Sequence, residues 1–89
     1  MEPLTNREDV KYYLGRLYFQ KADYKKAIKI YKEGLSINPQ ALILLYEIGL
    51  AYTKFKKRRS ALKYWKKLLN IAPHSFFANE VGQRLKRQK

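Results

Sequence analysis

Apolar residues recur along the chain at the spacing of amphipathic helices. In the first such segment four of them fall on one side of a helix, namely Val10, Leu14, Leu17 and Tyr18. A second segment carries a stripe of small and large apolar residues, namely Ala27, Ile28, Tyr31, Gly34 and Leu35. This helix is expected to end before Pro39, because the residue before a proline is biased away from helical geometry. The two segments together predict a helical hairpin.

The rest of the chain repeats this layout. Helices are expected over about residues 40–55 and 59–71, and the second of them carries the inward stripe Ala61, Leu62, Trp65, Leu68 and Leu69. After Pro73 one more amphipathic helix follows, with Phe77, Val81 and Leu85 along one side. Asp23 and Ser75 stand where N-caps of the second and the last helix are needed. The pattern predicts an all-α chain.

The layout is an internal repeat. The offset from Pro39 to Pro73 also aligns further pairs of similar residues: Leu14 with Ile48, Gly15 with Gly49, Tyr18 with Tyr52, Ala27 with Ala61, Tyr31 with Trp65, and Ile37 with Ile71. The period is about 34 residues, and a period of this length indicates stacked structural units rather than one irregular fold.

Gly15 and Gly49 occupy the same position of the two units, in the middle of a helix. Glycine there costs roughly 0.5–1 kcal/mol relative to alanine. Close approach of the paired helix accounts for both glycines, and we expect Ala27 and Ala61 to form the other side of that contact. The large side chains of Tyr18, Tyr31, Tyr52 and Trp65 are then expected to fill the space between hairpins.

The period and the order Leu-Gly-x-x-Tyr, Ala-x-x-x-aromatic and Pro resemble the tetratricopeptide repeat. The resemblance implies a helical-hairpin solenoid of two repeats, residues 8–41 and 42–75, closed by a capping helix over residues 76–87. The whole chain then forms one domain. Ala22 departs from the family pattern, because it stands where a glycine is usual in the turn. Two repeats make a short array, so the cap helix, a second copy or further repeats must complete the core.

In tetratricopeptide proteins the first helix of each hairpin lines a concave surface that binds peptides. Carried over to this chain, the resemblance places a partner-binding groove at Tyr12, Arg16, Phe19, Gln20, Ile43, Tyr46, Leu50 and Lys54. Several of these residues are apolar, whereas a face that only meets water is expected to be polar. Tyr12, Phe19, Tyr46 and Leu50 are the expected anchors.

The apolar side chains of this groove need not be free to bind a partner. The cap helix, a second copy of the chain or missing repeats could cover them instead. One family mode is disfavoured: members that clamp a C-terminal carboxylate use Lys and Asn at set positions. Tyr12, Arg16 and Glu47 stand at those positions here.

A second candidate surface is a basic stripe on the outer helices. It consists of Lys25, Lys29, Lys32, Arg59, Lys63, Lys66 and Lys67. The spacing i, i+4, i+7 places each trio on one helix face. Twenty Lys and Arg stand against seven Asp and Glu, a formal net charge of +13. The stripe is therefore a possible docking site for nucleic acid or another anionic surface, with solubility as the simpler role. No aromatic residues are interleaved in it, so contact with nucleic acid is expected to be non-specific.

Catalytic and metal sites find no support in the sequence. The chain has no cysteine and a single histidine, His74, and its acids are scattered. We expect no enzyme activity, no cofactor, no metal and no small-molecule substrate. The sequence predicts a cytoplasmic adaptor that binds another protein, with self-association as an alternative. A chain of this size is also compatible with a piece of a longer protein.

Overall fold

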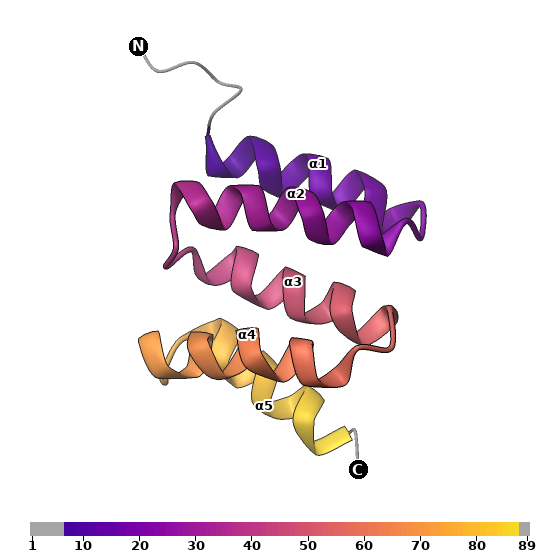
Figure 1. Cartoon of the computed structure of the whole chain (residues 1–89). Helices are drawn as coiled ribbons and strands as arrows, with labels where there is room; N and C mark the ends of the chain where they lie inside the picture. Colours follow the sequence, from indigo (N-terminus) through magenta and orange to yellow (C-terminus); the bar gives the residue numbers. More distant parts are fainter. Residues whose placement is uncertain (1–6, 88–89) are drawn as a thin grey trace.

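The computed structural model describes residues 7–87, which form five helices (Figure 1). They are α1 (Glu8–Gln20), α2 (Tyr24–Ile37), α3 (Leu42–Lys54), α4 (Arg58–Ile71) and α5 (Phe76–Arg87). α1 and α2 form one antiparallel hairpin, α3 and α4 form a second, and α5 crosses the end of the stack. The predicted fold class, an all-α helical-hairpin solenoid, is confirmed.

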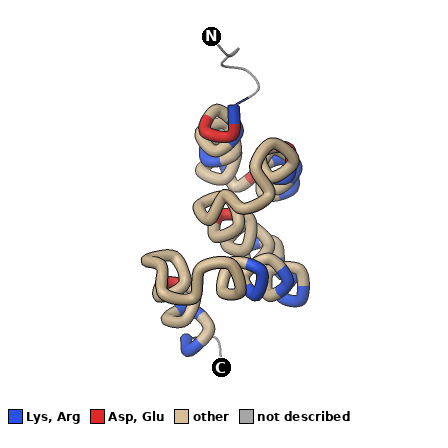
Figure 2. The backbone as a smooth tube through the Cα atoms, turned by 90° about the vertical axis from the view of Figure 1, so that its left-hand side faces the viewer, with Lys and Arg blue, Asp and Glu red and all other residues tan. Residues whose placement is uncertain are grey.

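The helices are arranged in two layers (Figure 2). α1, α3 and α5 make one layer, and α2 and α4 make the other. We call the outer sides of these layers the α1/α3/α5 face and the α2/α4 face. The former corresponds to the concave surface that the family resemblance implies.

Short polar side chains start two of the helices. Asp23 accepts a hydrogen bond from the backbone N–H of Lys26, at 3.3 Å between Oδ1 and N. Ser75 Oγ accepts one from the backbone N–H of Ala78, at 3.1 Å. Each bond satisfies an amide that has no partner within its own helix. The N-caps predicted at Asp23 and Ser75 are confirmed, whereas the capping box also predicted from Thr5 to Glu8 falls partly outside the described residues.

In each hairpin an aromatic ring of the second helix packs directly on a glycine of the first helix. A methyl group added at Gly15 would overlap the Tyr31 ring, and one added at Gly49 would overlap the Trp65 ring. The prediction of close helix approach at the glycines therefore holds, but the closest partners are these rings, not Ala27 and Ala61. Tyr31 and Trp65 thus pack within their own hairpins, and each also belongs to a buried cluster that includes the next helix along the stack, α3 for Tyr31 and α5 for Trp65.

The first helix buries less of its apolar stripe than predicted. Leu14 and Leu17 are exposed, as is Tyr13. Their counterparts one repeat later include Ile48 and Ala51, which are fully buried. The difference is positional, because α2 packs against α3 whereas no described helix packs on the outer side of α1.

Both hairpin turns use a left-handed backbone residue that carries a side chain. Ala22 has φ 62° and Lys56, its counterpart in the second repeat, has φ 61°. A Cβ in this region costs about 1–2 kcal/mol, and glycine removes that cost while losing part of the gain as unfolded-state entropy. We expect Ala22→Gly and Lys56→Gly each to raise the free energy of unfolding by about 0.5–1 kcal/mol. Thermal unfolding followed by circular dichroism measures this.

Lys21→Gly is the matched control for these turn variants. Lys21 adjoins Ala22 but has φ −83°, an ordinary value for any residue. Glycine at this position is expected to lower the free energy of unfolding by about 0.5–1 kcal/mol. Equal melting temperatures for Lys21→Gly and Lys56→Gly would show that the turn conformation carries no strain.

Candidate functional site

The predicted groove residues lie on the α1/α3/α5 face with unequal exposure. Gln20 and Lys54 are exposed, and Tyr46 is buried. The others are half-buried, namely Tyr12, Arg16, Phe19, Ile43 and Leu50. The α1 part of this face is therefore open, and its centre is partly covered.

Tyr46 is not the open groove anchor that the sequence predicted. Its ring packs on Phe77 of α5, with 5.5 Å between centroids. The Arg84 side chain donates a hydrogen bond from Nε to the Tyr46 hydroxyl at 2.9 Å, and its guanidinium lies 5.9 Å from the ring centroid. Tyr46 is 8% exposed as a result. It anchors α5, so at this position the cap helix covers the apolar side chain.

Glu47 is a buried acid beneath this face. It is 6% exposed and lies in α3, a helix that is apolar on nearly all sides. Its Oε2 atom lies 3.7 Å from a terminal nitrogen of Arg16. Burial raises the pKa of the Glu47 carboxyl above its ordinary value, and the positive charges of Arg16 and Arg84 partly oppose that rise. The carboxylate thus pairs with Arg16 of α1, while the charge of Arg84 of α5 acts on it from further away.

Tyr31 adds a second buried polar group near Glu47. Its hydroxyl is buried and lacks a well-aligned hydrogen-bond partner among the described atoms. Burial, followed by the negative charge of Glu47, raises the pKa of Tyr31 far above its ordinary value. The Tyr31 hydroxyl therefore stays protonated at neutral pH.

Arg16, Leu50 and Arg84 occupy equivalent repeat positions on the α1/α3/α5 face, and we call these three residues the arginine row. The Arg16 side chain is 43% exposed although Glu47 and the Tyr12 ring, 6.0 Å from its guanidinium, hold it in place. Sequence reasoning did not place Glu47 or Arg84 in the site. The signal available was one acid inside the otherwise apolar run from Leu42 to Tyr52.

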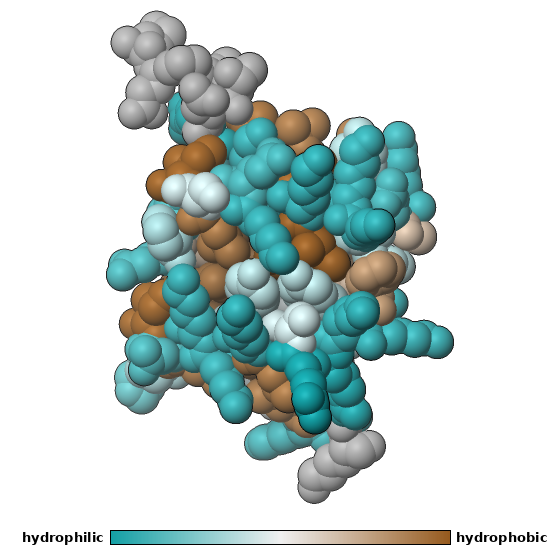
Figure 3. Space-filling model, in the orientation of Figure 1, coloured by the Kyte–Doolittle hydropathy of each residue, from teal (hydrophilic) through white to brown (hydrophobic). Residues whose placement is uncertain are grey.

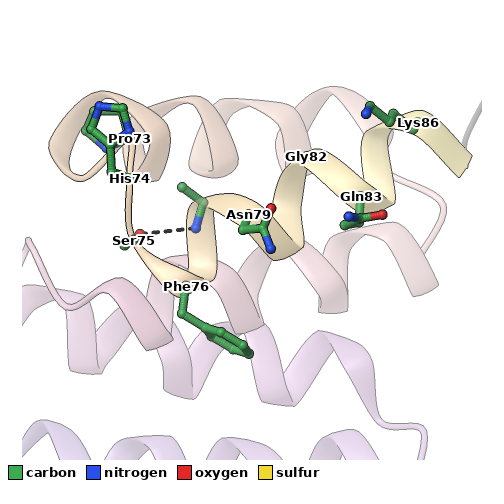
Figure 4. A pocket seen from close by; sticks show the side chains of 9 residues that line it. Pro73, His74, Ser75, Phe76, Asn79, Gly82, Gln83 and Lys86 are labelled. Carbon is green, nitrogen blue, oxygen red and sulfur yellow. Dashed lines mark hydrogen bonds between the residues drawn. The ribbon is translucent and has the colours of Figure 1, made fainter.

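Two shallow pockets lie on the α1 and α5 sides of residues 7–87. One of about 270 Å³ lies along α1, lined by Tyr12, Tyr13, Arg16, Leu17 and Gln20. A larger one, of about 600 Å³, follows α5 from Pro73 and His74 to Lys86 (Figure 4). It contains none of the predicted site residues. Within residues 7–87, no three His, Cys, Asp or Glu side chains gather as metal ligands would.

The predicted basic residues all lie exposed on α2 and α4, namely Lys25, Lys29, Lys32, Arg59, Lys63, Lys66 and Lys67. Figure 2 shows Lys and Arg along both helices, and Figure 3 shows hydrophilic side chains spread over this face with apolar ones between them. The expectation that no aromatic residues lie among these basic side chains is wrong. Tyr52 of α3 and Tyr64 of α4 stack there, with 5.7 Å between centroids and an interplanar angle of 19°.

Comparison with known proteins agrees with this repeat architecture. A family model described as "TPR repeat" matches residues 15–54, and one described as "Tetratricopeptide repeat" matches residues 44–75. The chain belongs to the tetratricopeptide repeat family. Repeats of this family generally mediate protein–protein interaction and are generally non-enzymatic scaffolds.

Two similar proteins place the repeat in longer chains. The chain is 32% identical over 74 residues to "BBSome complex member BBS4" of Bos taurus, covering 82% of this chain and 14% of that protein. It also resembles the crystal structure of the MamA protein, with a TM-score of 0.72 and 36% identity over 79% of this chain and 38% of that one. The chain therefore spans well under half the length of either.

The helices also bear on insertion into a membrane. Among residues 7–87, no helix has both the length and the apolar composition needed to cross a bilayer.

Proposed function

We propose that the chain is a protein-interaction module whose α1/α3/α5 face binds a segment of another protein. The observation that carries the proposal is the row of Arg16, Leu50 and Arg84 over the buried Glu47 carboxylate. Two arginines with an apolar side chain between them are complementary to a segment with acidic groups on either side of an apolar residue.

The arginines are held in position before a partner arrives. Glu47 and Tyr12 contact Arg16, and the Tyr46 hydroxyl accepts a hydrogen bond from Arg84. A guanidinium has five N–H donors, and these contacts use only part of them. The remaining donors are available to a partner's carboxylates or carbonyls. Because the side chains are already ordered, binding loses less conformational entropy.

Apolar contacts complete the proposed surface. Leu50 lies between the two arginines, and Tyr12, Phe19 and Ile43 extend the half-buried apolar area beside it. Gln20 and Lys54 are exposed at its edge and supply polar contacts. A partner side chain packed on Leu50 would bury apolar surface on both molecules. This hydrophobic contribution to the affinity does not depend on direction. The directional hydrogen bonds of the two arginines would then fix the register of the bound segment.

The test replaces the fork-shaped arginines but keeps their charge. Peptides selected from a displayed random library on the wild-type chain serve as probes. Arg16→Lys/Arg84→Lys leaves a positive charge on each side of Glu47 but removes the planar donors, so affinity is expected to fall about tenfold. Arg7→Lys/Arg87→Lys makes the same exchange away from the row, and less than a twofold change is expected. Calorimetric titration measures both.

Two results would contradict the proposal. One is selected peptides without acidic residues, and the other is equal affinity for the two double variants. A test built on Tyr46→Ala is unsuitable, because Tyr46 anchors α5 and its loss would change the fold. Sedimentation of the wild-type chain shows whether a second copy occupies the same face.

A further inference from the structure

The α2/α4 face contains a pocket that the proposed function does not use. It has a volume of about 300 Å³ and is lined by Lys25, Ile28, Lys29, Lys32, Tyr52 and Phe55. We call it the α2/α4 pocket. The lysines lie along α2. Tyr52 comes from the last turn of α3, which passes between α2 and α4, and Phe55 follows that helix directly. The pocket thus has an apolar floor beside a row of ammonium groups.

The charges around this pocket are unbalanced. Lys25, Lys29 and Lys32 are exposed, and no described carboxylate forms an ion pair with any of them. The two acids near them in sequence are engaged elsewhere: Asp23 caps α2 and Glu33 pairs with Lys11 of α1. α4 contains no acid at all. Like charges at this spacing destabilise a helix slightly, so an anionic ligand would be stabilised here.

Phe55 distinguishes this pocket from an ordinary charged helix face. It is 41% exposed and follows α3 directly. The residue at the same place in the first repeat is Lys21. The repeat fold therefore does not require an aromatic side chain at this turn. An exposed Phe55 beside Ile28 offers an apolar contact to a ligand.

The geometry favours a peptide side chain over a nucleic-acid base. Tyr52 is contacted from the α4 side by the stacked Tyr64 and from the α2 side by Lys32, whose Nζ lies 5.5 Å from the ring centroid. Its ring faces are thus already engaged, whereas base binding needs an open ring face. The volume is at the lower end of the ~300–1,000 Å³ range of ligand pockets, so it suits one side chain.

Lysine spacing matches an extended acidic segment. Lys25 and Lys29 are four residues apart on a helix, a rise of about 6 Å. Alternate residues of an extended chain are about 6.6 Å apart. Carboxylates at alternate positions of a segment can therefore face successive lysines of α2. We propose that the α2/α4 pocket binds an acidic segment of another protein through one large apolar side chain, which packs on Phe55 and Ile28 and on the edge, not the faces, of the Tyr52 ring.

The test uses a short fluorescein-labelled glutamate-rich peptide with one central leucine, and the same peptide with serine in its place. Fluorescence anisotropy at ~0.15 M salt measures their affinities. The leucine peptide is expected to bind about tenfold tighter than the serine peptide. In the Arg16→Lys/Arg84→Lys background, where the other proposed surface is weakened, Phe55→Ser, at an exposed position, is expected to abolish this difference and leave the serine peptide unaffected.

Variants that remove three positive charges distinguish binding in the pocket from general electrostatic attraction. Lys25→Gln/Lys29→Gln/Lys32→Gln is expected to weaken leucine-peptide binding about tenfold more than Arg7→Gln/Lys86→Gln/Arg87→Gln, which removes the same charge elsewhere. Because the leucine peptide also suits the proposed α1/α3/α5 face, the comparison of the two peptides is repeated in Arg16→Lys/Arg84→Lys. The leucine preference is expected to persist there, which makes this result independent of the proposed function. Equal binding of the two peptides, equal effects of the two triple variants, or loss of the leucine preference in Arg16→Lys/Arg84→Lys would overturn the proposal. Oligo(dT) binding that depends on Phe55 would overturn it in favour of nucleic acid.

Discussion

Gly49→Ala is expected to lower the free energy of unfolding by about 3 kcal/mol, the largest single effect in the second hairpin. A methyl group there overlaps the Trp65 ring. That ring cannot move aside easily, because it is 1% exposed and its indole N–H donates a hydrogen bond to the Tyr46 carbonyl at 3.2 Å. Urea unfolding followed by the fluorescence of Trp65, the single tryptophan, measures the loss. Gly15→Ala is expected to behave similarly against Tyr31.

Gly82→Ala is the control for the intrinsic cost of glycine in a helix. Apart from the adjacent residues and the backbone of α5 itself, no described atom lies within 4 Å of a methyl group placed at Gly82. The free energy of unfolding is therefore expected to rise by about 0.5–1 kcal/mol. If Gly49→Ala also stabilised the chain, the contact between glycine and ring would not be what closes the hairpin.

The fold could be predicted from the repeat spacing because the same spacing relates residues with different structural roles. The same offset relates the glycines, the aromatic residues and the turns. Two N-cap residues, Asp23 and Ser75, could be identified because capping depends only on local sequence. These features need no knowledge of distant neighbours.

Predictions failed where the burial of a side chain depends on a helix that is distant in the sequence. Leu14 and Ile48 occupy the same repeat position, yet only Ile48 is covered, because α2 precedes α3 whereas no described helix precedes α1. Tyr46 was placed in an open groove because the path of α5 over it is not encoded in a local pattern. Hydrophobic periodicity shows which side of a helix is apolar, but it does not show what covers that side.

The two candidate surfaces illustrate the same limit. Helical spacing placed the lysines of α2 and α4 on one face correctly. It could not show that Tyr52 and Phe55, which belong to the other layer, reach that face between the two helices. Likewise, Arg84 lies far from Arg16 in the sequence, near the opposite end of the chain, but acts on the same carboxylate. Both surfaces are built from residues that only the stacking of units brings together.

Val81→Asp is expected to detach α5, with a loss of about 3 kcal/mol or more. Val81 is fully buried in the cluster that contains Tyr46, Trp65 and Leu68. A carboxylate at this position would have no room to reach water while α5 stays docked. Trypsin is expected to cut after Arg84 faster than in the wild type, and Trp65 fluorescence is expected to shift to longer wavelength. Gln83→Asp adds the same charge at an exposed position and is expected to do neither.

The outcome for Val81→Asp also bears on the proposed binding face. Docked α5 holds Arg84 beside Tyr46 and Glu47, so its detachment would remove one end of the arginine row and leave Glu47 with Arg16 alone. Selected peptides should then lose affinity as they do for Arg16→Lys/Arg84→Lys. Tighter peptide binding after detachment would contradict this, because it would mean that α5 covers the binding surface instead of completing it.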